Sequence, residues 1–334
     1  MRLADPRPGR TSRRRAIRII GAAAGLPALG AALVHGSPEA ASFHEWQGEA
    51  LGAVATLSLW HGDKARARRS LRLALIELQR LEEIFSLYTP KSELRRLNEA
   101  GALTRPSLDL RIVLEASQRI GALSRGAFDV SVQPLWELHH RYFDADPAAT
   151  EGPPRAAVEA ARARVDFRQI DVGPRRIGLR LPGMAVTLNG IAQGYITDRI
   201  TDLLRQEGFD HAMVDMGEIR ALGPHPQGRA WRVGLRDGHG SVGAGRTVEL
   251  ADAAVAVSGS YGLTFDATGR HHHLFDPQTG RSASASGDCA VVATTAMVAD
   301  ALATAICVAG ADQASTLLDA YPGSRMIFTS ATAG

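Results

Sequence analysis

Asp300 and Thr304 are the two polar residues in a stretch that is otherwise apolar from Ala296 to Ala309. Residues four apart on a helix lie on one face, so a carboxylate and a hydroxyl could converge there on one hard cation. A buried carboxylate is costly unless it is paired or bound to a metal. Mg²⁺ takes oxygen ligands and leaves its remaining positions to substrate phosphates and water. The spacing is therefore typical of a magnesium site, with a capped or paired structural Asp as the alternative.

A run of three histidines stands in the segment RHHHLFDPQTGRSAS, residues 270–284. Successive residues of a strand point to opposite faces, so at most His271 and His273 share a side. A single histidine that acts as a general base, or as a donor to phosphate, is therefore more economical than a zinc tract. Asp276-Pro277 and Thr279-Gly280 are turn sequences. Solvated loop histidines are the alternative.

Two further kinds of segment suit a phosphate and a flat ring. In VTLNGIAQGYITDRITDLL, Gly190 and Gly194 bracket the start of a helix, where backbone N–H groups and the helix dipole favour anions. The segment matches neither the dinucleotide fingerprint nor the Walker loop. In SRGAFDVSVQPLW and AVSGSYG, small residues stand beside Phe128, Trp136 and Tyr261, as a ring pocket would need. An ordinary turn beside a core has the same composition.

The elements that must position these residues follow from the apolar periodicity of the chain. We expect strands over 50–62, 184–188, 211–216 and, with Gly-rich turns, within 231–257; helices over 71–85, from Ser92, and over 107–125, 194–207 and 296–309; a loop over 126–136; and an insertion or exposed helix over 143–164. Thr294 or Thr295 is the expected N-cap of the last helix and Gly310 its stop. Because strands and helices mix without a steady βαβ repeat, the order favours an α+β fold over a doubly wound one.

The composition is that of an ordinary globular protein. The chain has 334 residues, of which 45% are hydrophobic and 22% charged, enough for one large domain or two small ones. Lys and Arg total 38 against 35 Asp and Glu, and several of the positive charges crowd the N-terminus, so the charge of +3 does not indicate a nucleic-acid partner. Cys289 and Cys307 match no metal spacing and are expected to be small buried hydrophobes.

Residues 1–41 have the features of an export signal. Arginines precede a Gly/Ala-rich apolar stretch, residues 19–34, and small residues follow near Ala40-Ala41, where a peptidase could cut. Residues 12–18, SRRRAIR, resemble the twin-arginine pattern. We therefore expect export to the periplasm by that route, with a catalytic domain over residues 42–334. The general secretory route and an uncleaved anchor are the alternatives.

Taken together and in order, these segments resemble the ApbE family of FAD:protein FMN transferases. The resemblance runs from Leu51-Gly52 to about Phe328 and is carried by six blocks in register: SLYTPKSELRRLN, GAFDVSVQPLW, NGIAQGYITD, AVSGSY, HHLFDPQTG and TTAMVADALATA. It implies a single α+β domain related to the T-fold. It also implies that Asp300 and Thr304 bind Mg²⁺ by their side chains and Gly190 by its backbone carbonyl, and that His273 is the essential histidine.

The same resemblance implies the residues that contact FAD. They are Leu51, Tyr88, Ala127, Phe128, Asp129, Thr187, Gln193, Ser258, Gly259 and Leu274. The sequence departs from the family pattern in three places: Leu51-Gly52-Ala53 replaces Met-Gly-Thr, Gln193 replaces the common Lys, and DMGEIRALG has one Gly fewer than usual. The last departure puts the role of Glu218 in doubt.

The implied activity is Mg²⁺-dependent transfer of FMN from FAD to a Ser or Thr hydroxyl of a target protein, with release of AMP. His273 is the expected base, and Asp300 is a second candidate for that role. The LNGIAQGY segment and the twin-arginine pattern are most similar to the NosX branch, which implies a membrane flavoprotein of the nitrous oxide reductase system as the target. A Mg²⁺-dependent FAD pyrophosphatase and a flavin-binding accessory protein without turnover are the alternatives.

Overall fold

The computed structural model describes residues 17–18, 42–235, 247–284 and 288–329. Its centre is a seven-stranded sheet in the order β15-β14-β11-β8-β7-β3-β2, in which every neighbouring pair is antiparallel. The strands are β2 (Ser42–Ala50), β3 (Ala53–His61), β7 (Ala212–Asp215), β8 (Ile219–Leu222), β11 (Ala254–Ser258), β14 (Cys289–Ala293) and β15 (Arg325–Thr329). All but two residues of the expected export signal, 1–41, lie outside the described part of the chain.

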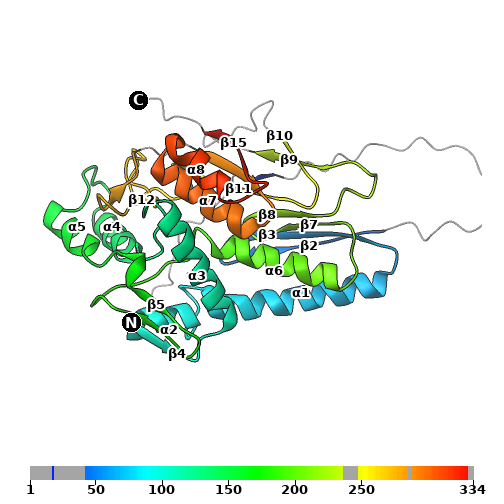
Figure 1. Cartoon of the computed structure of the whole chain (residues 1–334), viewed down its shortest axis with the longest axis horizontal. Helices are drawn as coiled ribbons and strands as arrows, with labels where there is room; N and C mark the ends of the chain where they lie inside the picture. Colours follow the sequence, from blue (N-terminus) through cyan, green and yellow to red (C-terminus); the bar gives the residue numbers. More distant parts are fainter. Residues whose placement is uncertain (1–16, 19–41, 236–246, 285–287, 330–334) are drawn as a thin grey trace, which may run out of the picture.

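Helices cover one face of this sheet (Figure 1). They are α1 (Lys64–Phe85), α6 (Ala192–Gln206), α7 (Ala296–Ala309) and α8 (Ala314–Asp319). The N-cap of α1 is Asp63, whose carboxylate accepts bonds from two of the first backbone N–H groups of the helix. Helix α7 packs against β11 and β14, and α6 packs against β7 and β8. The main apolar core therefore lies between the sheet and these helices.

The opposite face of the sheet carries a smaller sheet in the order β1-β9-β10, made of Ile17–Arg18, Trp231–Leu235 and Thr247–Leu250. A second apolar cluster joins the two layers, with Met213 and Ile219 on one side and Val233 and Val248 on the other. No helix among the described residues is both long and apolar enough to cross a membrane.

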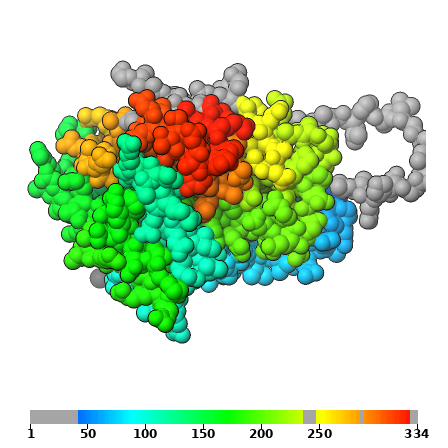
Figure 2. All heavy atoms as spheres, in the orientation of Figure 1, coloured from blue at the N-terminus to red at the C-terminus, as the bar shows by residue number. Residues whose placement is uncertain are grey.

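A helical lobe packs beside the helix-covered side (Figures 1 and 2). It consists of α2 (Glu93–Ala100), α3 (Leu108–Leu123), α4 (Gln133–Ala145) and α5 (Arg155–Arg162), with a small sheet of β4 (Ala102–Thr104), β6 (Arg176–Leu179) and β5 (Ile170–Val172), and with the hairpin of β12 (Phe275–Asp276) and β13 (Arg281–Ser282). Figure 2 shows the green and orange segments of this lobe gathered at one end of the molecule. The mixture of layers confirms an α+β fold.

Two local expectations were wrong, and a third needs a shifted boundary. Residues 184–188 form an isolated bridge, Val132 to Ala185, and not a strand, because the side chain of Asn98 bonds both the N–H and the carbonyl of Val186 (2.7 and 2.8 Å) in place of a neighbouring strand. The loop expected over 126–136 ends early, because α4 begins at Gln133. The strand expected over 50–62 is confirmed as β3, but it begins only at Ala53, because Leu51 and Gly52 form the two-residue turn that joins it to β2.

Candidate active site

A cavity of about 1460 Å³ lies at the junction of the sheet, helix α7 and the helical lobe. Its inner wall contains the C-terminal end of β11, the α7 residues Asp300, Thr304 and Val308, and the loops that precede α4 and α6. A smaller cavity of about 60 Å³ shares five lining residues with it, among them Trp136, Asn189 and His273. Every residue that the sequence assigned to FAD, metal or base lines one of these two cavities.

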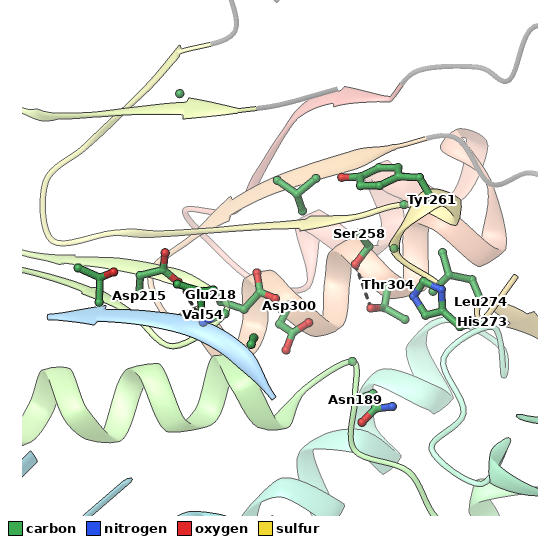
Figure 3. A pocket seen from close by; sticks show the side chains of 18 of the residues that line it. Val54, Asn189, Asp215, Glu218, Ser258, Tyr261, His273, Leu274, Asp300 and Thr304 are labelled. Carbon is green, nitrogen blue, oxygen red and sulfur yellow. Dashed lines mark hydrogen bonds between the residues drawn. The ribbon is translucent and has the colours of Figure 1, made fainter. Parts of the chain in front are cut away.

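The three residues assigned to the metal, Gly190, Asp300 and Thr304, all line the larger cavity, and Figure 3 shows the latter two side by side on α7. Asp300 is 2% exposed, and one of its carboxylate oxygens accepts a bond from the Gly194 N–H at 3.2 Å. The hydroxyls of Thr304 and Ser258 are 3.1 Å apart. Gly190 lies so close that a Cβ atom there would be 3.0 Å from the Thr304 hydroxyl oxygen. A carboxylate, a hydroxyl and a backbone carbonyl are oxygen donors, so this set fits Mg²⁺.

The absence of a side chain at Gly190 favours this arrangement, because a Cβ atom there would be in tight contact with Thr304, which would have to shift by a few tenths of an ångström. Among the described residues, no three His, Cys, Asp or Glu side chains gather in the way that a protein-only metal site requires. A cation held by Asp300, Thr304 and Gly190 would have further coordination positions open to a substrate and water.

The residues assigned to FAD divide between the two cavities. Ala127, Phe128, Asp129, Thr187, Ser258, Gly259 and Leu274 line the larger cavity, whereas Leu51, Tyr88 and Gln193 line the smaller one. Leu51 and Gly52 both have positive φ angles, 47° and 77°, as the tight hairpin turn requires. The N–H of Leu51 donates to the Glu82 carboxylate at 2.8 Å, which holds the strained turn in place at the cavity mouth.

The carboxylate of Asp129 has a structural task within the site. It accepts bonds from the N–H and hydroxyl of Ser131 (2.7 and 2.6 Å) and from the N–H of Phe167 (3.0 Å). Burial raises the pKa of Asp129, and these bonds oppose that effect. Asp129 therefore fixes the course of the loop that carries Ala127 and Phe128 along the cavity wall.

The three histidines occupy three different environments. The His271 ring lies 5.0 Å from the Phe143 ring in the lobe, and the His272 ring is buried, which lowers its pKa to about 4. His273 lines both cavities. Its Nδ1 lies 3.1 Å from the carbonyl of Leu263, which can only accept, so in the neutral ring Nε2 is the basic nitrogen. Figure 3 shows Thr304 between His273 and Asp300.

The three histidines lie in three different environments, whereas the alternation of a regular strand would place them on only two sides. His271 and His273 do not share a side, because the segment is irregular and bridges its neighbour only at His272 and Thr264. His273 lines the cavity, whereas His272 is buried and does not line it.

A comparison with protein-family models matches residues 51–328 to the ApbE family. The chain belongs to the ApbE family. A protein of Treponema pallidum named FAD:protein FMN transferase is 34% identical over 235 residues, which are 65% of this chain and 64% of that protein. A protein of Klebsiella pneumoniae with the same name is 30% identical over 216 residues, 62% of this chain and 61% of that protein. The chain thus aligns with less than two thirds of the length of these relatives.

Solved structures of ApbE proteins share the fold. The ApbE protein of Thermotoga maritima aligns with a TM-score of 0.73 and 26% identity, over 85% of this chain and 93% of that one. The flavin transferase ApbE of Vibrio cholerae aligns with a TM-score of 0.71 and 24% identity, over 86% and 93%. The expected ApbE-like fold is therefore confirmed.

Asn189 and Asp215, to which the sequence assigned no role, also line the larger cavity. Tyr261, expected beside a ring pocket, and Glu218, whose role the sequence left in doubt, line it as well. Burial raises the pKa of Asp215 to about 6, and a bond from the Gly217 N–H opposes this shift. The sequence did contain one sign that Asp215 could belong to a site: it is a carboxylate at the end of the apolar strand AMVD. Asp215 lies on the cavity wall because β7 pairs with β3 and β8, and no local sequence pattern predicts that pairing.

Proposed function

We propose that this protein is a Mg²⁺-dependent FAD:protein FMN transferase. The observation that carries the proposal is the convergence of Asp300, Thr304, Gly190 and His273 on one cavity that is large enough for a dinucleotide. The names of the Treponema and Klebsiella relatives support it. The cavity presents oxygen donors at one side and a histidine at the other, as transfer of a phosphoryl group to a hydroxyl requires.

In the proposed reaction, the hydroxyl oxygen of a target Ser or Thr attacks the FMN-side phosphorus of FAD. The bond from that phosphorus to the bridging oxygen breaks, AMP leaves, and FMN stays on the target as a phosphoester. Nε2 of His273 takes the hydroxyl proton, because a protein hydroxyl is a poor nucleophile at its free pKa. Asp300, Thr304 and Gly190 would hold Mg²⁺, which would neutralise negative charge that develops on the pyrophosphate.

The test is to incubate the protein with FAD, Mg²⁺ and a target domain that carries an acceptor Thr. We expect one AMP released for each FMN that mass spectrometry finds on the target. Release of free FMN and AMP with an unmodified target would establish an FAD pyrophosphatase instead. Bound FAD without any AMP would establish a flavin-binding accessory protein. A target with the acceptor Thr replaced by Val is the matched control.

We further propose that the target is a membrane flavoprotein of the nitrous oxide reductase system, as in the NosX branch, and that the protein works in the periplasm. The LNGIAQGY segment and the arginine pattern of residues 12–18 support this. Replacing Arg13 and Arg14 by Lys should then leave the precursor in the cytoplasm. Normal periplasmic accumulation of that variant would indicate the general secretory route.

A further inference from the structure

Where helices α6 and α7 cross, a carboxylate of each helix accepts hydrogen bonds from the N-terminal backbone of the other. Asp198 of α6 accepts bonds from the N–H groups of Ala296 (2.8 Å) and Met297 (2.9 Å), the first two residues of α7. In return, Asp300 of α7 accepts from the N–H of Gly194 (3.2 Å), in the first turn of α6. The first N–H groups of a helix have no partner within the helix. Each helix therefore supplies the carboxylate that satisfies the N-terminus of the other.

This exchange occurs where the two backbones are in close contact. A Cβ atom at Gly194 would lie 2.3 Å from the carbonyl oxygen of Ala296, so no other residue type fits there without movement of a helix. Gly190 lies two residues before α6, and Asp300 and Thr304 lie in the second and third turns of α7. A shift of one helix along the other would therefore change the distances among the three metal-binding residues.

Asp198 is held in place by a third partner. Arg220 of β8 donates to it at 2.8 Å, and both side chains are buried, each residue being 8% exposed. Burial raises the pKa of Asp198 to about 6, opposed by Arg220 and by the two amides. Arg220 also donates to Asp202 at 3.3 Å, but the Asp202 side chain is 41% exposed and lies one turn further along α6. Three hydrogen bonds therefore hold the Asp198 carboxylate where α6 and α7 cross.

We propose that Asp198 is a positioning residue for the metal site: by joining the N-terminus of α7 to α6, it sets the separation of Gly190 from Asp300 and Thr304. The inference rests on the proposed function for the identity of the metal. Asp198 lies within the family match and ends the NGIAQGYITD block, but the residues that the resemblance assigns to FAD, metal or base do not include it. Residues that orient metal ligands without touching the metal typically change its affinity by about 10- to 100-fold.

The experiment is to titrate Mn²⁺, an octahedral oxygen-binding probe for Mg²⁺, into the FAD-loaded protein without acceptor, and to count free Mn²⁺ by electron paramagnetic resonance. In Asp198→Asn, which has the same shape but no charge, we expect the Mn²⁺ dissociation constant to rise by about 10- to 100-fold. FAD affinity without metal should stay within about two-fold of wild type, since Asp198 does not line either cavity. Saturating Mg²⁺ should restore most of kcat.

Two controls separate positioning from general stability. Asp202→Asn removes a carboxylate from the same arginine, and Thr295→Ala removes the ordinary N-cap of α7, whose hydroxyl accepts from Val298 N–H at 3.4 Å. Thr295→Ala should lower Tm, yet both controls should bind Mn²⁺ within about two-fold of wild type. If Asp198→Asn does not fold, Asp198→Glu moves the charge by one methylene and should show a loss near the lower end of the same range.

Unchanged Mn²⁺ affinity in a folded Asp198 variant, or an equal loss in Thr295→Ala, would overturn the inference. A wild-type protein that binds no Mn²⁺ would overturn it as well. Wild type that binds Mn²⁺ but transfers no FMN would refute the proposed transferase and leave the positioning role standing.

Discussion

The metal side and the base side of the cavity are built in different ways. On the metal side, our name for Gly190, Gly194, Asp300 and Thr304, the proposed ligands lie on or just before two helices whose N-termini bond each other's carboxylates. Asp300 is 2% exposed. On the base side, defined as residues 262–274, His273 stands in an irregular segment that bonds its neighbour through His273 N–H to Leu263 O (3.0 Å).

The difference follows from what each side has to do. Metal coordination needs oxygen atoms at fixed separations, and regular helices in close contact supply that. A general base needs one nitrogen within reach of a proton, which a single ring oriented by one backbone carbonyl supplies. Changes on the metal side should therefore alter metal affinity and stability together, whereas changes on the base side should alter rate alone.

The largest effect is expected at Asp300. Asp300→Asn keeps an oxygen that can accept from the Gly194 N–H but loses the charge that holds the cation, so the fold should survive and Mg²⁺-dependent transfer should fall to background. Asp300→Ala should do the same with a lower Tm. Transfer assays and Mn²⁺ titration measure both results. Thr304→Ser, which keeps the hydroxyl, is the matched control and should retain most activity. Full activity in Asp300→Ala would remove the metal assignment.

The next effect tests the base side. His273→Ala should bind FAD and Mn²⁺ almost normally yet transfer FMN about 10²–10⁴-fold more slowly, the usual contribution of general base catalysis. The wild-type rate should rise with pH through one ionisation, because only the neutral ring accepts a proton, and the variant should lose that rise. His271→Ala and His272→Ala are the controls and should be much milder. A collapse of FAD affinity in His273→Ala would make His273 a binding residue, and Asp300 would become the candidate base.

The sequence predicted the metal side better than the rest of the cavity. Helix α7, with its cap at Thr295 and its end before Gly310, was predicted at the correct residues because caps and apolar runs are local signals. The two cysteines were expected to be buried, and both are buried thiols without a disulfide. Asp300 and Thr304 then share the cavity wall because they are one turn apart.

What the sequence did not predict depends on partners far along the chain. The strand β2 was missed because its alternation places polar residues such as His44 and Glu45 among aromatic ones, and its pairing with β3 defines it. The side chain of Asn98, 88 residues earlier in the chain, bonds the backbone of Val186 and takes the place of a neighbouring strand there. The exchange between Asp198 and α7 joins residues about a hundred positions apart, so no window of the sequence contains both.

A third prediction tests the close contact on the metal side. Alanine favours helices over glycine by about 1 kcal/mol, so Gly194→Ala would stabilise an isolated α6. In this structure the new Cβ would be 2.3 Å from a backbone oxygen, so we expect a net loss of about 1–3 kcal/mol in the free energy of unfolding. Urea unfolding measures it, and Mn²⁺ affinity should fall in parallel. A stabilised variant would show that the helices can separate without strain.

The smallest effect concerns Asp215, a carboxylate on the cavity wall that accepts one bond from Gly217 N–H, whereas Asp198 accepts three. Burial raises the pKa of Asp215 to about 6 in the folded protein, above its ordinary value of 3.8. The folded state therefore binds the proton more tightly than the unfolded state between those values, so stability from this group falls as pH rises through that window. Ionised Asp215 thus destabilises the fold above about pH 6.

Asp215→Asn should accordingly stabilise the protein at pH 8, where the wild-type group is charged, and by less at pH 5, where it is largely neutral. The full pKa difference corresponds to about 3 kcal/mol. Because the side chain is only half-buried and borders the open cavity, we expect about 1 kcal/mol. Thermal unfolding at the two pH values measures the gain. Asp171→Asn is the control, since that side chain is 57% exposed and should change Tm at neither pH. An equal gain at both pH values would mean that the amide packs better than the carboxylate at this position for reasons unrelated to charge.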